Sequence, residues 1–173
     1  YGMHYNFPYY QKLFENYGFG LYFNQYTYYR KVNDPLPQKY NDKAERILAD
    51  PAYSFCHMSI KDLPKYTEDF RTVYNKGWAK HEGVKAMREA QAAGIMKTLK
   101  PVIDERIMWF AYYDKEPVGF FIAIPELNKL FRYVDGEMNL LGKLKFVFHK
   151  WRGVCTTMYG IVFGITPEHQ SKG

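Results

Sequence analysis

The last strand-like run of the chain leads directly into a polar loop, and this junction constrains the fold more than any other feature. Residues 158–165 form a short apolar run, as in a buried strand, and the run ends at Thr166-Pro167. The polar and small residues that follow, up to Gly173, are typical of a loop whose backbone N–H groups converge on one point. Such a concavity suits a pyrophosphate group. The sequence therefore predicts a sheet that delivers one strand into an anion-binding loop.

The chain before this junction has the periodicities of an α/β domain. Residues 53–60 have the composition of a strand, and Asp62 can cap a helix whose apolar residues recur every three or four positions. Pro101 ends or kinks a second helix, and residues 114–117 connect two further strands as a hairpin. We expect a mixed, mainly antiparallel sheet flanked by helices, in which strands near 107–113, 118–124 and 156–165 are consecutive neighbours and helices at 62–78 and 84–99 pack on it.

The closing segment resembles motif A of the GNAT superfamily of N-acetyltransferases, in which a strand-loop-helix unit holds the pyrophosphate of acetyl-coenzyme A. The chain stops before the second small residue, which that motif places two positions after its first glycine, so we expect a sheet that is incomplete at the C-terminus. The resemblance implies a coenzyme A thioester as cofactor. It also implies that the thioester contacts the backbone of Phe163 and Ile165, and that the phosphates contact the backbone N–H groups of Gln170, Ser171, Lys172 and Gly173.

A second, weaker part of the resemblance lies in the hairpin. Residues 116–120, Glu-Pro-Val-Gly-Phe, are similar to the equivalent hairpin of that family, where the glycine permits close packing beneath the cofactor. The order of strand, two helices, hairpin and strand-loop is also that of the front portion of an acetyltransferase, with an insertion at 126–152. The resemblance therefore covers residues 53–173.

The N-terminal segment, residues 1–40, differs from the rest because it contains ten of the 17 tyrosines. Within it, residues 13–19 resemble motif B of the same family, the helix and Gly-Phe pair that come late in an acetyltransferase. This implies that residues 1–40 are the tail of a preceding acetyltransferase-like half, joined by a linker at 41–52; a chance helix followed by Gly-Phe is the alternative. Phe14 occupies the position where motif B often has a tyrosine that protonates the departing thiolate. The resemblance therefore leaves the catalytic acid unknown.

Charge and cysteine content restrict the partners and the location. The formal charge of +6 and the many tyrosines suggest nucleic-acid binding as a hypothesis. The cations, however, are mostly spread along the chain, and no RNA-binding or zinc-finger pattern occurs. A solvated surface or attraction of polyanionic coenzyme A explains the charge instead. Cys56 and Cys155 lie far apart in apolar runs, which indicates buried free thiols in a reducing compartment. With no run near about 18 apolar residues and no secretory signal, we expect a cytoplasmic protein without membrane association.

These observations predict transfer of an acyl group from a coenzyme A thioester to a small-molecule or peptide amine. Tyr74 and Trp78 close the first helix, where acetyltransferases often contact the substrate, and Glu126 follows the hairpin as a further substrate-contacting residue. No spacing of histidines predicts a metal site. The alternative is a non-catalytic acetyltransferase-fold module that binds a ligand or partner. The unpaired strand edge of an incomplete sheet also favours self-association.

Overall fold

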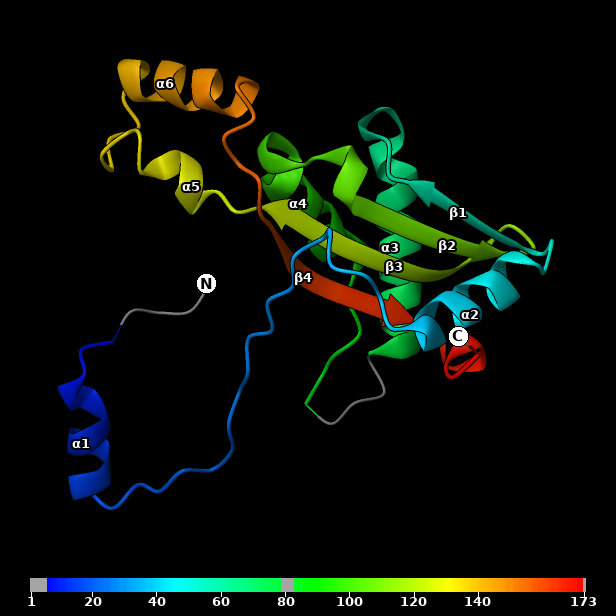
Figure 1. Cartoon of the computed structure of the whole chain (residues 1–173), viewed down its shortest axis with the longest axis horizontal. Helices are drawn as coiled ribbons and strands as arrows, with labels where there is room; N and C mark the ends of the chain where they lie inside the picture. The colour runs from blue at the N-terminus through cyan, green and yellow to red at the C-terminus, as the bar shows by residue number, and fades with distance from the viewer. Residues whose placement is uncertain (1–5, 79–82, 173) are drawn as a thin grey trace. The chain divides into compact units, whose positions relative to one another are not determined.

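A computed structural model describes residues 6–78 and 83–172 in two compact units, Tyr1–Pro37 and Gln38–Gly173. The first unit contains helix α1 (Tyr9–Asn16), which ends before Gly18 takes a positive φ of 102° (Figure 1). All of its described residues, 6–37, are exposed, aromatic side chains included. These residues therefore bury no apolar core, and the origin of residues 1–40 from a preceding half stays a prediction.

The second unit is built on a four-stranded sheet with the order β1-β2-β3-β4, in which every pair of described neighbours is antiparallel (Figure 1). The strands are β1 (Tyr53–His57), β2 (Met108–Tyr113), β3 (Glu116–Pro125) and β4 (Met158–Ile165). Asp114 and Lys115, both with positive φ, join β2 to β3. This two-residue connection is shorter than the predicted four-residue one, because a mirror-image turn matches the twist of the strands.

Helices cover one face of this sheet. In Figure 1, α3 (Leu63–Gly77) and α4 (Glu89–Leu99) lie behind the strands, and α3 also contacts α4. Asp62 occupies the N-cap position of α3, but its side chain makes no capping hydrogen bond. The remaining helices of the described chain are α2 (Gln38–Leu48), α5 (Asn128–Phe131) and α6 (Leu140–Trp151), with short 3₁₀ turns at Ile60–Asp62, Lys100–Val102, Glu105–Ile107 and Pro167–His169.

The core lies between α3, α4 and the sheet. Tyr66, Phe70 and Val73 recur at three- and four-residue steps along α3 and are buried against Phe110 and Phe120 of the sheet. Cys56, at the border of this core, and Cys155 are both free thiols, but they are half-buried and not fully buried as predicted. The packing of α3 on β3 and β4 places the C-terminal end of the helix beside the last residues of β4.

The fold class predicted from the sequence is confirmed, including the consecutive pairing of the last three strands. Several boundaries differ: the first strand ends at His57 instead of residue 60, and the last begins at Met158 instead of residue 156. The second helix begins at Glu89 instead of residue 84, after Arg88 in an extended conformation at its N-cap. Most of the segment 41–52, expected as a linker, lies in α2, whose apolar side chains Ile47 and Leu48 lie beside Phe55 of β1.

Candidate functional site

The edge of β4 presents backbone groups to one side of the sheet. Thr166 donates its N–H to the carbonyl of Val118, and the register pairs Gly164 with Phe120 and Ile165 with Gly119. Because hydrogen-bonded and non-hydrogen-bonded pairs alternate in an antiparallel ladder, Gly164 and Thr166 bond to β3 while Phe163 and Ile165 direct their N–H and C=O groups away from it. In the described part of the chain β4 has no second neighbour, so these groups lie along an open edge.

Two side chains reach the outward carbonyls of this edge. The indole Nε1 of Trp78 donates to the carbonyl of Phe163 at 2.8 Å, and the amide of Gln170 donates to that of Ile165 at 3.1 Å. Trp78 comes from the end of α3, whereas Gln170 comes from the loop after β4. The carbonyls of the edge are thus already engaged by residues that the sequence analysis had assigned to substrate and cofactor.

Two glycines allow α3 to approach β4 closely. A Cβ on Gly164 would lie 2.9 Å from two carbons of the Phe120 ring and 3.2 Å from Nε1 of Trp78. A Cβ on Gly77 would lie 3.0 Å from the carbonyl oxygen of Ile165. Real Cβ atoms essentially never make a contact of 2.9 Å, and a contact of 3.0 Å is among the tightest that they make. Side chains at either position would therefore push α3 away from β4. The position of Trp78 over the edge therefore depends on both glycines.

The loop after β4 turns back on itself within a few residues. Pro167–His169 forms a 3₁₀ turn in which His169 donates its N–H to Thr166, a buried residue. Ser171 has a φ of 63°, in the left-handed region that L residues rarely adopt, and the carbonyl of Lys172 accepts a hydrogen bond from Arg46 of α2 at 2.8 Å. Between the 3₁₀ turn and Ser171, Gln170 is extended with a ψ of 151°, and its N–H donates to the carbonyl of Pro167 at 3.3 Å. Gly173, the last predicted phosphate ligand, lies outside the described residues.

His169 anchors this loop to the sheet, and the sequence analysis did not assign it a role. Its Nδ1 lies 2.6 Å from the hydroxyl of Tyr53, and its ring packs against those of Tyr53 and Tyr113 with centroid distances of 5.5 and 4.9 Å. Burial lowers the pKa of His169, and the charge of Lys172 lowers it further. The partners of His169 come from β1 and β2, which are distant in the sequence. The only local signal for this role was the position of His169 in the loop motif, between Glu168 and Gln170.

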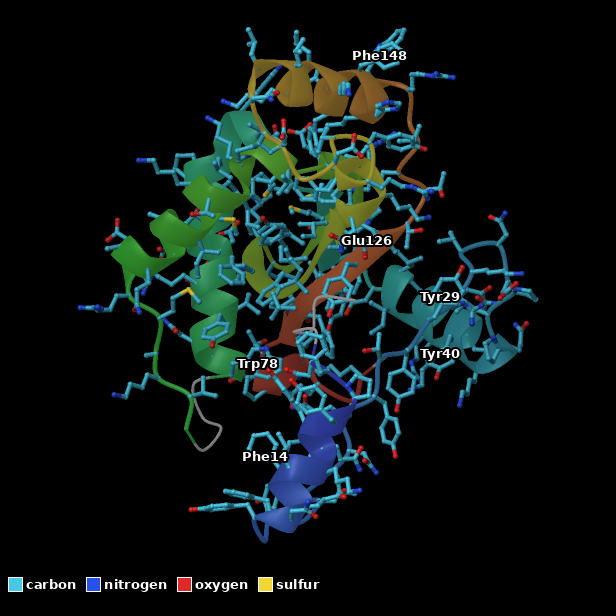
Figure 2. All side chains as sticks on the ribbon, turned by 90° about the vertical axis from the view of Figure 1, so that its left-hand side faces the viewer. Phe14, Tyr29, Tyr40, Trp78, Glu126 and Phe148 are labelled. Carbon is cyan, nitrogen blue, oxygen red and sulfur yellow. The ribbon has the colours of Figure 1, made fainter. Side chains whose placement is uncertain are left out.

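The predicted substrate residues do not converge on this loop. The ring of Tyr74 stacks on Trp78 at 6.5 Å and packs on the border of the core, so these two residues do lie together. Glu126 is buried at the other end of β4, where its N–H bonds to Thr157 and its carboxylate accepts from the N–H of Asn128 at 3.1 Å. Figure 2 labels Trp78 and Glu126 at separate places along the sheet. Since β4 rises about 3.4 Å per residue from Met158 to Ile165, Glu126 lies roughly 25 Å from the loop.

Comparisons with known proteins give partial matches. No protein-family model matches the chain. The bacterial ceramide synthase of Caulobacter vibrioides is 29% identical over 97 residues, which cover 54% of this chain and 25% of that protein. Protein YghO of Escherichia coli is 25% identical over 101 residues, which cover 58% of this chain and 26% of that protein. The chain thus spans about a quarter of the length of these curated relatives.

Among solved structures, the chain is similar to the ligand-free form of a mutant agmatine N-acetyltransferase. The TM-score is 0.35 at 10% identity, and the alignment covers 69% of this chain and 62% of that one. Within residues 6–78 and 83–172, no helix combines the length and apolar character that crossing a membrane requires.

Proposed function

We propose that this chain forms the thioester-binding part of an N-acyltransferase, which moves an acyl group from a coenzyme A thioester to an amine. The observation that carries the proposal is the open edge of β4, where Phe163 and Ile165 direct their backbone groups outward just before the polar loop at 166–172. The pantetheine arm of coenzyme A carries two amide groups, which can bond to a strand edge as another strand would. The phosphates would then meet the loop at residues 170–172.

The chemistry needs little beyond this arrangement. The amine nitrogen attacks the thioester carbonyl and forms the amide bond, the carbon–sulfur bond breaks, and the proton that the amine loses is balanced by the one that the departing sulfur takes up as the thiol. Backbone N–H donors at the β4 edge would stabilise the negative charge that develops on the carbonyl oxygen. Lys172 in the loop and the formal charge of +6 favour the approach of polyanionic coenzyme A.

The name of the Caulobacter vibrioides relative supports both the reaction type and an acceptor class. Ceramide is an amide of a fatty acid and a long-chain amino alcohol, so its formation is an N-acyl transfer. We therefore propose a long-chain amino alcohol as the acceptor. An apolar surface lies beside the proposed thioester edge, because Phe121, Phe163 and Ile165 are all exposed on β3 and β4.

A second function, ligand binding without transfer, is favoured by one specific observation. The carbonyl of Phe163 already accepts a hydrogen bond from Trp78, and that of Ile165 accepts one from Gln170. With these bonds in place, the edge holds a ligand only through its N–H groups, and the carboxylate of Glu126 is too far away to take up a proton from the amine.

The test removes one outward N–H group without changing the inner ladder. In Ile165→Pro the lost N–H is the one that faces the edge, where proline is tolerated, whereas the matched control Ile165→Val keeps it. Coenzyme A at a hundredfold over its dissociation constant stabilises the folded state by about 2.7 kcal/mol. That corresponds to a rise in melting temperature of roughly 5–10 °C for a chain of this size. We expect the rise in the unsubstituted protein and in Ile165→Val, but not in Ile165→Pro.

Thiol release separates the two candidate functions. The protein is incubated with acetyl- or palmitoyl-coenzyme A and an amine panel that includes sphinganine, and free thiol is followed with time. Amine-dependent release supports the transferase, whereas a thermal shift without release supports ligand binding alone. Absence of a shift with every thioester would refute a thioester site at β4.

A further inference from the structure

Helix α6 carries an apolar face that its own unit does not cover. At about 100° per residue, six of its apolar side chains project within a sector of about 120°. These six residues are Leu140, Leu141, Leu144, Val147, Phe148 and Trp151, and all are exposed, with Leu140 at 75%, Leu144 at 60% and Trp151 at 82%. Figure 2 shows Phe148 on the outer side of α6. We call this set the outer face of α6.

The opposite side of the helix is the one that packs on the protein. Gly142 is buried, the ring of Phe146 lies 5.5 Å from that of Phe131, and the ring of His149 stacks on Tyr133 at 4.0 Å. The helix thus lies beside α5 and the turn after it, as Figure 1 also shows. Because Gly142, Phe146 and His149 project on the side away from the outer face, that face points out from the second unit.

Cations border the outer face on both sides. At about 100° per residue, Lys143 and Lys150 project along one border, and Lys145 and Arg152 along the other. Residues 138–157 contain no carboxylate. Lys150 also donates to the carbonyl of Pro101 at 3.2 Å, and the guanidinium of Arg152 lies over the ring of Phe148. An apolar sector between two rows of cations is the pattern of a helix that lies in a lipid–water interface.

We propose that the outer face of α6 docks on an anionic lipid bilayer, with the helix axis in the plane of the membrane. The apolar side chains would enter the boundary between headgroups and acyl chains, while the lysines reach out to the phosphates on either side. At about 1.5 Å per residue this helix is far too short to span a bilayer, so it lies on the surface. A protein groove would cover the apolar sector as well, but it would not require cations along both borders.

This proposal departs from the expectation of a protein without membrane association, which rested on long apolar runs and secretory signals and not on amphipathic helices. It is argued from α6 alone and does not rest on the proposed acyl transfer. Surface docking would nevertheless suit an enzyme whose acceptor is a lipid amine, because such a substrate lies in the membrane.

The test is flotation of the protein with vesicles of phosphatidylcholine, with and without phosphatidylglycerol. We expect co-flotation with the anionic vesicles and little with the neutral ones. Leu144→Glu places a charge in the middle of the outer face and should abolish co-flotation. The matched control Leu21→Glu changes an equally apolar, exposed residue in the first unit and should leave it unchanged. Since Leu144 is exposed, both variants should keep the circular dichroism spectrum of the parent protein.

The charge contribution is measured with Lys143→Gln combined with Lys145→Gln, one from each border. Near an anionic surface each cation adds roughly fivefold to the partition coefficient, so the double variant should bind roughly thirtyfold more weakly. A blue shift of tryptophan emission with vesicles, absent in Trp151→Phe, would place the outer face in the interface. Equal binding of neutral and anionic vesicles, loss of binding in Leu21→Glu but not Leu144→Glu, or a dimer that Leu144→Glu dissociates without any vesicle binding would overturn the proposal.

Discussion

Replacing Gly164 by alanine should destabilise the second unit by displacing α3 from β4. The new Cβ would lie 2.9 Å from two carbons of the Phe120 ring, which is buried and packed against Phe70, and 3.2 Å from Nε1 of Trp78. Overpacking of this kind costs about 1–3 kcal/mol. The hydrogen bond from Trp78 to the carbonyl of Phe163, 2.8 Å long, would be lost or lengthened, which adds about 1 kcal/mol.

The sum, about 3 kcal/mol, corresponds to a fall in melting temperature of roughly 6–12 °C for a chain of this size. The control is Gly160→Ala in the same strand, where the new Cβ would meet Phe121 at an ordinary 3.4 Å. Chemical unfolding followed by tryptophan fluorescence gives the free energy of unfolding of both variants. The reasoning would be refuted if the two variants unfold at the same denaturant concentration, since alanine would then have the same effect at a crowded strand position and at one with ordinary contacts.

Two further predictions concern polar groups of the second unit. Asp69→Ala should lower the free energy of unfolding by about 2–3 kcal/mol, because the buried hydroxyl of Tyr112, which donates to Asp69 at 2.6 Å, loses its acceptor. The control Lys65→Ala should lower it by less than about 1 kcal/mol, since Lys65 is mostly exposed. Equal losses for the two variants in denaturant titrations would contradict this prediction. The lowered pKa of His169 means that the unfolded chain takes up a proton first on acidification, so this residue contributes stability above about pH 6.5 that is lost as the pH falls through its lowered pKa. Unfolding curves at pH 7.5 and 5 should therefore differ more for the unsubstituted protein than for His169→Gln, and an equal difference would show that His169 does not carry the effect.

Local sequence patterns were sufficient to predict most elements of the second unit. The steps between Tyr66, Phe70 and Val73 define one apolar helix face, and the apolar runs around Phe110 and Phe120 define strands, because burial on one side imposes these periods on the chain itself. The loop after Ile165 could be located in the same way. The helix over residues 38–48 was missed although Tyr40, Ala44, Ile47 and Leu48 recur along it at helical spacing, because most of this segment was interpreted as a linker.

Tertiary structure alone decided which residues meet at the candidate site. Trp78 reaches the carbonyl of Phe163 only because Gly77 and Gly164 let α3 approach β4, and His169 bonds to Tyr53 across more than a hundred residues of sequence. The register of β3 and β4 places Glu126 at the far end of the strand from the loop, which no local pattern could indicate. The amphipathic character of residues 140–151 could be predicted from their sequence. Which face of this helix stays exposed was determined only by its packing against α5 and the turn after it. The physical reason is that side-chain contacts between distant segments depend on how the whole unit is assembled.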